Sequence, residues 1–194
     1  MKNVIVIGAG PAGLMASIKL AEMGHKVTVF ESMPKIARKL GISGKGRGNI
    51  TNSCSYEEFL KHFNNNGRFL KTAFRCFFNT DLINFFRNEG ITTTEERGGR
   101  IFIGSGRATD AVNALHKALL KRKINLMVNS PVSELLIDNR TCLGVSSNGR
   151  QHRSDAVILA TGGKSYPATG STGQGYELAK ACGHRDYFLI LYKL

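Results

Sequence analysis

A glycine pattern near the N-terminus, Gly8-x-Gly10-x-x-Gly13, constrains this chain more than any other feature. It follows a β-branched apolar run at residues 4–7 and precedes a largely apolar stretch with helical character. In such a strand–turn–helix unit the first glycine permits a tight turn, the second lets the backbone approach a pyrophosphate, and the third lets helix and strand pack closely. The free N–H groups at the start of the helix favour an anion. The sequence therefore predicts a Rossmann-type nucleotide site at residues 8–13.

An acidic residue at the end of the next strand supports this interpretation. Residues 26–30 read as a second apolar strand, and Glu31 follows it, 18 residues after Gly13. A carboxylate at that place accepts hydrogen bonds from ribose hydroxyls and disfavours the 2′-phosphate of NADP. The residues alone therefore leave two ligands open, FAD and NAD.

The remainder of the chain alternates between strands and helices. Further buried strands are expected at residues 124–128 and 156–160, helices within 56–90 and near 175–182, a hairpin at 92–103 turning at Gly98-Gly99, and a helix from an N-cap at Thr109. Between two of the strands, residues 132–138, 141–147 and 150–153 read as an antiparallel meander, with Asn148-Gly149 as a two-residue turn. This order predicts an α/β fold with an attached β-meander.

Two more glycine-rich segments are candidates for the walls of the site. Residues 35–53 form a basic loop that departs from the Walker A pattern, and its small residues and cations suit either a large anionic cofactor or a solvated surface. Ala160-Thr161-Gly162-Gly163 ends a buried strand, and carboxyl ends of parallel strands meet at one crevice. The polar loop at 165–173 is a candidate to line a substrate or flavin face.

The charge invites anionic partners, because 27 Lys and Arg face 14 Asp and Glu, a net charge of +13. Phenylalanine-rich helices within 56–90 also carry five cations, Lys61, Arg68, Lys71, Arg75 and Arg87. Cations with aromatic rings can bind nucleic acid, but phenylalanines at three- and four-residue spacings favour a hydrophobic core contact. The composition excludes disorder, collagen and coiled coil.

Other chemistries lack their motifs. The four cysteines form no CxxC pair, the five histidines lie on different elements without ligand spacing, and no GxSxG occurs, so no metal site is expected. No residue is assigned as the catalytic acid or base, and Tyr166 is the nearest candidate. Without a signal peptide or about 18 consecutive apolar residues, the expected location is the cytoplasm, with no membrane contact.

Together these segments resemble a known family. GAGPAG, RKLGISGKGRGNITN, GGRIF with SGRATDAVNAL, and LATGGKSYPATGSTGQGYELAKACGH are similar to the YhiN/BaiN-like bacterial flavoproteins, NAD(P)/FAD-dependent oxidoreductases that include aminoacetone oxidases and dehydro-bile-acid reductases. The resemblance implies a glutathione-reductase-type Rossmann domain that binds FAD, with NAD(P)H as a candidate donor. The implied cofactor-binding residues are Gly8, Gly10, Pro11, Ala12 and Gly13 for the pyrophosphate, Glu31 and Ser32 for the ribose, Arg38 and Lys39 on the adenosine side, Ser43, Gly44, Gly46, Arg47 and Asn49 near the flavin, Val132 beside the adenine, and Ala160, Thr161, Gly162 and Gly163 closing the site.

The chain departs from the family in two places. The loop that often reads GRCN has Gly48 in place of the cysteine, which argues against disulfide-reductase chemistry. Family members run to about twice this length, so residues 1–184 are expected to be the N-terminal part of the FAD/NAD(P)-binding domain and residues 185–194 match nothing. We hypothesise a truncation, by a frameshift near residue 185, which the missing motifs in another downstream reading frame would support.

The sequence thus predicts the N-terminal portion of an FAD-dependent oxidoreductase acting on a small organic substrate. Two alternatives stay open: an NAD-dependent Rossmann dehydrogenase, and a basic nucleic-acid-binding module or non-catalytic fragment. The oligomeric state, the substrate and the electron donor are not readable from the residues.

Overall fold

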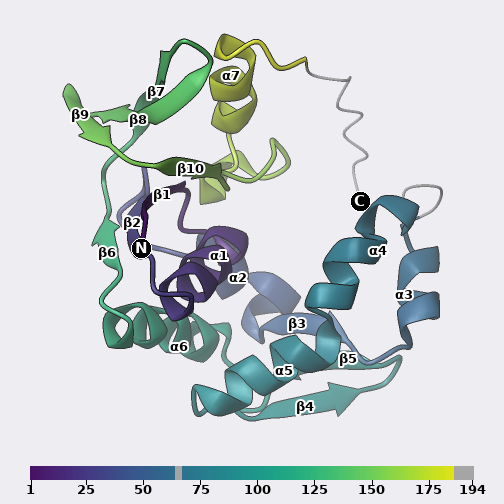
Figure 1. Cartoon of the computed structure of the whole chain (residues 1–194). Coiled ribbons are helices and arrows are strands. Elements are labelled where there is room, and N and C mark those ends of the chain that lie inside the picture. Colours follow the sequence, from purple (N-terminus) through teal and green to yellow (C-terminus); the bar gives the residue numbers. More distant parts are fainter. Residues whose placement is uncertain (64–66, 186–194) are drawn as a thin grey trace. The chain divides into compact units, whose positions relative to one another are not determined.

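The computed structural model describes residues 1–63 and 67–185 and divides into two units (Figure 1). The first unit comprises residues 1–39 and 116–194, and the second comprises residues 40–115. The predicted nucleotide motif lies in the first unit, and most of the predicted basic loop lies in the second.

A parallel four-stranded sheet forms the centre of the first unit, in the order β10-β1-β2-β6. Its strands are β1 (Asn3–Ile7), β2 (Lys26–Phe30), β6 (Asn125–Met127) and β10 (Ala156–Leu159). Residues 4–7 of β1 are buried throughout, as expected of a central strand covered on both faces. The order places β1, which leads into the glycine motif, beside β10, which leads into Thr161-Gly162.

Helix α1 (Pro11–Glu22) connects β1 to β2. Pro11 occupies its first position, where a missing N–H costs nothing and the fixed φ suits the helix. Gly13, Leu14, Ser17 and Ile18 form its buried face, and the Ser17 hydroxyl donates to the Gly13 carbonyl at 2.7 Å. The β-strand, helix and β-strand predicted within the first thirty residues are therefore confirmed.

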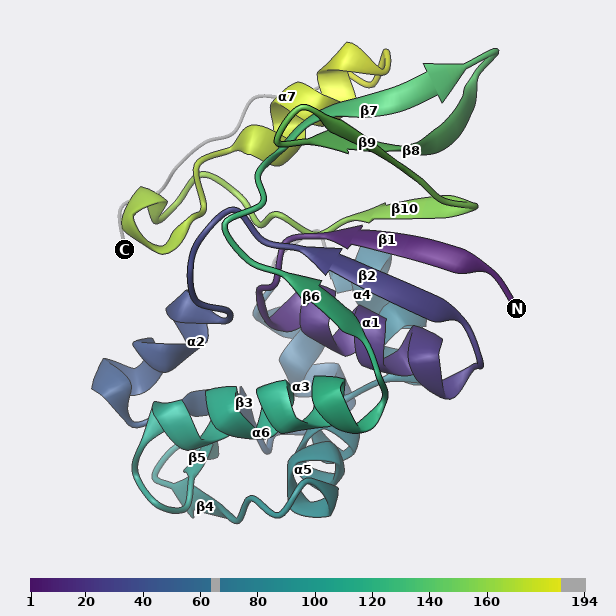
Figure 2. The same cartoon turned by 90° about the vertical axis from the view of Figure 1, so that its left-hand side faces the viewer.

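The antiparallel meander has the predicted bounds: β7 (Val132–Asp138), β8 (Thr141–Ser147) and β9 (Arg150–Arg153). Asn148 and Gly149 both adopt positive φ, as a two-residue hairpin turn requires. Figure 2 shows the meander above the parallel sheet, with helix α7 (Gln174–Ala181) at its side. A shared core of buried side chains joins these elements: Ile5, Ile7, Phe30, Val132, Val145 and Leu178.

The second unit has a small antiparallel sheet and three helices. The strands, in the order β3-β5-β4, are β3 (Asn49–Asn52), β4 (Thr93–Glu96) and β5 (Arg100–Ile103), and the helices are α3 (Tyr56–Lys61), α4 (Gly67–Cys76) and α5 (Asn79–Asn88). Buried Asn79 joins them, because its side-chain amide donates to the carbonyls of Asn52 and Cys54 at 2.7 and 3.0 Å. The predicted hairpin, with its turn at Gly98-Gly99, is confirmed.

An aromatic cluster holds the three helices of the second unit together. Phe59 is its centre, with ring centroids 5.3 Å from Phe74 and 5.2 Å from Phe78. Phe63 and Tyr56 extend the cluster at centroid distances of 5.9 Å from Phe59 and 5.7 Å from Phe78. Edge-to-face rings at these distances contribute about 0.5–1.5 kcal/mol per pair beyond their burial. The predicted hydrophobic role of these phenylalanines is confirmed.

Three details of the sequence prediction are wrong. Residues 35–53 are more than a loop, because they contain α2 (Arg38–Gly41), a 3-10 turn (Ser43–Gly46) and β3. Thr109 is not an N-cap, because α6 (Ala108–Lys121) already begins at Ala108, immediately after a tight turn at Gly106. Strand β10 ends at Leu159, although the Ala160 N–H still donates to the Ile7 carbonyl at 2.8 Å.

The end of α1 carries an ion-pair group whose effect on stability is testable. The Glu22 carboxylate accepts from Lys19 at 3.0 Å and from Arg122 at 2.7 Å, and these contacts, Lys19 first, hold the pKa of Glu22 below its usual 4.5. A lowered carboxyl pKa stabilises the fold above pH 4.5, and that stabilisation is lost as pH falls through the folded pKa.

We therefore expect Glu22→Gln to reduce the free energy of unfolding at neutral pH by less than about 1 kcal/mol, since the pair is largely exposed. Below the usual carboxyl pKa the two proteins should converge. Urea unfolding between neutral and acidic pH measures this, and a difference that persists unchanged in acid would contradict it.

Within the described residues no helix is both long and apolar enough to span a membrane, and no group of three or more His, Cys, Asp or Glu is arranged to hold a metal ion. All four cysteines are unpaired thiols. From residue 186 onward, the tail predicted to match nothing lies outside the described residues.

Candidate functional site

A cavity of about 220 Å³ lies where β1 and β10 end and α1 begins. All of its lining residues belong to the first unit. From the predicted set, the lining contains Gly8, Gly10, Pro11, Ala12, Glu31, Ser32, Arg38, Lys39, Val132, Ala160, Thr161 and Gly162. The structure therefore brings together segments near residues 10, 31, 38, 132 and 161, which are far apart in the sequence. This is the crevice at the carboxyl ends of the strands that the motif predicts.

Gly10 lies against open space at the start of α1. A Cβ on Gly10 would have no atom of the described residues within 4 Å apart from its two chain neighbours, and its φ of −73° is accessible to any residue. The protein itself therefore gives no reason for glycine at this position. Because Gly10 lines the cavity, the absent side chain leaves the backbone accessible to a ligand.

The same helix end supplies hydrogen-bond donors. The first intrahelical bond runs from the Leu14 N–H to the Gly10 carbonyl at 2.9 Å, so the N–H groups of Gly10, Ala12 and Gly13 precede the helical ladder. Together with the helix dipole, these groups favour a negative charge at the cavity.

Gly8 and Gly13 have a different role, since protein atoms crowd both. A Cβ on Gly13 would fall inside van der Waals contact with the Gly8 carbonyl oxygen and lie 3.2 Å from the Ala160 Cβ. Gly8 has φ +103°, and its Cβ would lie 2.8 Å from the Ala160 carbonyl carbon. Gly8, with its positive φ, permits the predicted tight turn, and Gly13 lets α1 approach the sheet closely, as predicted, without lining the cavity.

Glu31 is held in place by the backbone around it. One carboxylate oxygen accepts from the Ala9 N–H at 2.8 Å, and the other accepts from the Met33 N–H at 2.8 Å and the Ser32 hydroxyl at 3.3 Å. Its own main chain accepts from the Ser130 N–H at 2.8 Å. The carboxylate thus sits between the glycine turn and the start of the loop, with remaining lone pairs available to a ligand.

The opposite wall comes from the meander and α7. Val132 is buried at 1% exposure, and its carbonyl accepts from the Gln174 side-chain amide at 2.7 Å. Gly175 brings α7 close to Thr161, because a Cβ there would collide with the Thr161 hydroxyl. These contacts fix the predicted adenine-side residue and the predicted closing residue within one unit.

Several lining residues were missed by the sequence analysis: Lys35, Ser130, Thr169, Gly170, Ser171 and Gln174. The signal for three of them was present, since the polar loop at 165–173 was singled out without being assigned to the nucleotide. Gln174, the next residue, begins α7. Ser130 carried no signal, because only the three-dimensional approach of the segment before β7 brings it to Glu31.

The cavity has a positive side. Lys35, Arg38 and Lys39 line it, and Glu31 is its sole acidic residue among the described ones. The Lys39 ammonium donates to the Ser165 hydroxyl at 3.2 Å, which joins the basic segment to the polar loop. Three cations and a helix N-terminus make this a site for an anion of more than one charge.

The predicted flavin-side residues lie in the second unit, where they make structural contacts. The Arg47 guanidinium pairs with Glu96 at 2.7 Å and lies 4.2 Å from the centre of the Phe102 ring. The Asn49 amide donates to the Ile101 carbonyl at 3.1 Å, and the Ser43 hydroxyl donates to Leu40 at 2.9 Å.

Gly44 has φ +57° and leaves no room for a Cβ beside Phe102. The predicted set has seven members outside the cavity lining: Gly13, Ser43, Gly44, Gly46, Arg47, Asn49 and Gly163. Their predicted place around a cofactor stays a prediction, apart from the packing role already described for Gly13.

The donor set fits a dinucleotide such as FAD in chemistry but not in size. Backbone N–H groups at Gly10 suit a diphosphate, and the Glu31 carboxylate suits ribose hydroxyls. A volume of about 220 Å³ is below the ~300–1,000 Å³ usual for drug-sized ligands. The cavity therefore has room for only part of a molecule of that size.

Known proteins are similar to this chain in sequence. The chain is 35% identical over 183 residues to the ribosomal RNA dihydrouridine synthase of Haemophilus influenzae, covering 92% of this chain and 45% of that protein. It is 30% identical over 191 residues to the 3-dehydro-bile acid delta(4,6)-reductase of Clostridium scindens, covering 95% and 44%. The chain thus spans less than half the length of the curated relatives it matches.

A solved structure agrees on the fold. An open conformation of a flavocytochrome c3 fumarate reductase superposes with a TM-score of 0.68 at 20% identity, covering 93% of this chain and 40% of that one. The fold is thus the Rossmann-like α/β fold found in FAD-binding flavoproteins. The model of the HI0933-like protein Rossmann domain matches residues 2–186, and the chain belongs to that family.

Proposed function

We propose that this chain supplies the FAD-binding part of an oxidoreductase that acts on a small organic substrate. The observation that carries the proposal is the contrast between two glycines of one motif. Gly13 is required by packing, whereas nothing in the described protein requires Gly10, whose open side faces the cavity. A diphosphate against the Gly10 backbone accounts for the glycine at that position, and a ribose on Glu31 accounts for the carboxylate beside it.

The role of this chain's residues is to bind and orient the cofactor. The N–H groups at the start of α1 hold the diphosphate, the Glu31 carboxylate accepts from the ribose, and Lys35, Arg38 and Lys39 offset the remaining negative charge. FAD, when bound, supplies two-electron transfer at its isoalloxazine ring. The names of the bile acid reductase and the dihydrouridine synthase support a reduction as the direction of that transfer.

We further propose NAD(P)H as the electron donor and the cytoplasm as the location. The four unpaired cysteines suit a reducing compartment. An NAD-dependent dehydrogenase is the alternative within the same fold. The meander packed on the sheet supports FAD over it, because the flavocytochrome c3 fumarate reductase shares the fold over 93% of this chain.

Titration with FAD tests the proposal. The purified chain should carry visible flavin absorbance or quench flavin fluorescence with micromolar affinity or better, and NAD should bind more weakly. Binding of NAD but not FAD would favour the dehydrogenase instead. If a folded chain, verified by circular dichroism, binds neither, the proposed cofactor site is wrong.

RNA is a second candidate substrate class, favoured by the name of one relative and by the positive net charge of the chain. The H. influenzae relative is named for ribosomal RNA, and the chain has a net charge of +13. The expectation from the sequence disfavoured nucleic acid, because the phenylalanines near the cations were predicted to pack together. Most of them do, but Phe69 is exposed.

A further inference from the structure

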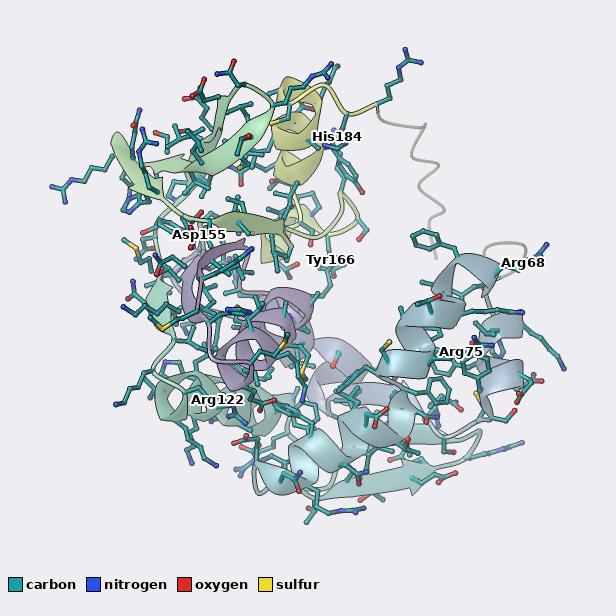
Figure 3. All side chains as sticks on the ribbon, viewed as in Figure 1. Arg68, Arg75, Arg122, Asp155, Tyr166 and His184 are labelled. Atoms are coloured by element: carbon teal, nitrogen blue, oxygen red, sulfur yellow. The ribbon has the colours of Figure 1, made fainter. Side chains whose placement is uncertain are left out.

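Helix α4 (Gly67–Cys76) has an outer face that the proposed flavin site does not use. Leu70 and Phe74 are its partly buried large side chains, and Phe74 joins the aromatic cluster of the second unit. At about 100° per residue, the exposed side of the helix carries Arg68, Lys71 and Arg75 within an arc of about 60°, and that arc begins about 60° from Phe74. All three are exposed, and Figure 3 marks Arg68 and Arg75 on this helix.

Phe69 shares that outer side. Its ring is 87% exposed, whereas Phe59, Phe63 and Phe74 pack against one another. Around the helix Phe69 lies about 100° from Arg68, with the exposed Thr72 between them. We call Arg68, Phe69, Lys71 and Arg75 the α4 face.

The cations of the α4 face are uncompensated, whereas several other cations of the chain are paired. Lys19 pairs with Glu22, Lys61 with Glu58, and Arg107 with Asp110, each within one helical turn. Helix α4 contains no acidic residue, and in residues 1–63 and 67–185 the three cations of the α4 face make no ion pair. Contact with water alone does not explain why this face has cations without acidic residues, or why a phenylalanine is exposed on it.

We propose that the α4 face binds single-stranded RNA. Three unpaired cations along one helix can contact successive phosphates of a flexible polyanion, with release of counterions. The exposed Phe69 ring on the same outer side offers a stacking surface to an unpaired base, and the paired bases of a duplex are not available for such stacking. The inference rests on RNA being the substrate class, the second candidate above, and it does not depend on the FAD site.

Fluorescence anisotropy with a labelled oligouridine of about 12 nucleotides tests the inference, a length within the ~4–16 nucleotides typical of single-strand sites. The combined variant Arg68→Gln, Lys71→Gln and Arg75→Gln should bind ~100-fold more weakly near 0.1 M salt, and its log–log salt slope should fall by about 2, from about 0.7 per lost phosphate contact. Phe69→Ala should lower affinity about 10-fold with the slope unchanged.

A matched control removes the same charge elsewhere. Lys117→Gln, Lys121→Gln and Lys180→Gln also lower the net charge by three, at exposed helical positions outside α4. This control should keep both the affinity and the salt slope. Equal losses in the two triple variants would overturn the inference in favour of non-specific attraction.

Two further measurements separate the remaining outcomes. If polyglutamate competes as well as RNA and Phe69→Ala has no effect, the face is a general polyanion surface and the inference is wrong. FAD titration of the same preparations should show no change in any variant. FAD binding without RNA binding overturns the inference and leaves the flavin proposal intact. RNA binding without FAD binding overturns the flavin proposal and leaves the inference intact.

Discussion

Replacing Gly13 with alanine is expected to destabilise the protein by about 3 kcal/mol or more, while the same change at Gly10 leaves its stability within about 0.5 kcal/mol of wild type. The added methyl at Gly13 meets the Gly8 carbonyl oxygen and the Ala160 side chain, and both belong to the sheet side of a close helix–strand contact. At Gly10 the methyl meets nothing within 4 Å. Urea unfolding of the two variants measures the difference.

For FAD binding by the folded variants the order is reversed, and Gly10→Ala has the larger effect. Gly10→Ala should lose at least about 10-fold in FAD affinity, because its methyl group occupies the space through which a diphosphate reaches the N–H groups of α1. Flavin fluorescence quenching provides the measurement, with Gly24→Ala, at a positive-φ turn outside the cavity lining, as a strain control. Unchanged FAD affinity in Gly10→Ala would place the diphosphate elsewhere.

Replacing Glu31 with glutamine is expected to affect stability and binding together. The carboxylate accepts N–H bonds on both oxygens, from Ala9 and from Met33, and an amide must present its NH₂ group to one of those donors. The lost bond and the repulsive contact should lower the free energy of unfolding by about 1–3 kcal/mol. FAD affinity should fall about 10-fold or more, because the glutamine amide has a single acceptor oxygen, which the ribose must share with a backbone N–H.

A ligand series separates the two roles of Glu31. Wild type should prefer ADP over 2′,3′-dideoxy-ADP, and Glu31→Gln should bind the two with nearly equal affinity, measured by calorimetry. Glu134→Gln, an exposed position on β7, serves as a control that keeps the preference. If the variant discriminates as well as wild type, the carboxylate holds the loop and does not contact the ribose.

The first unit could be predicted in detail because its signals are local. The β-branched run of β1, the glycine spacing and the Asn148-Gly149 turn each determine a short stretch of backbone by themselves. The meander strands accordingly have the predicted bounds. Within this unit β1 and β2 are joined by a β-strand, helix, β-strand crossover, and the meander strands pair with their neighbours in sequence.

The second unit was harder to predict because its pairing is not local. Strand β3 is the short polar segment Asn-Ile-Thr-Asn, and it becomes a strand only by pairing with β5, about fifty residues later. Helix α4 was expected, but the direction of Phe69 depends on which of its faces meets the aromatic cluster. Leu70 and Phe74 define that face, and Phe69 lies about 100° from Leu70 around the helix.

The backbone hydrogen bonds to the Glu31 carboxylate have a thermodynamic consequence for any ligand of this cavity. A free glutamate side chain gives up about 1.5–2 kcal/mol of rotamer entropy when it is fixed. Here Ala9 and Met33 fix the carboxylate as the chain folds, so the ordering cost belongs to folding and not to association. The acceptor is preorganised, and a nucleotide meets a site whose orientation at this point is already set.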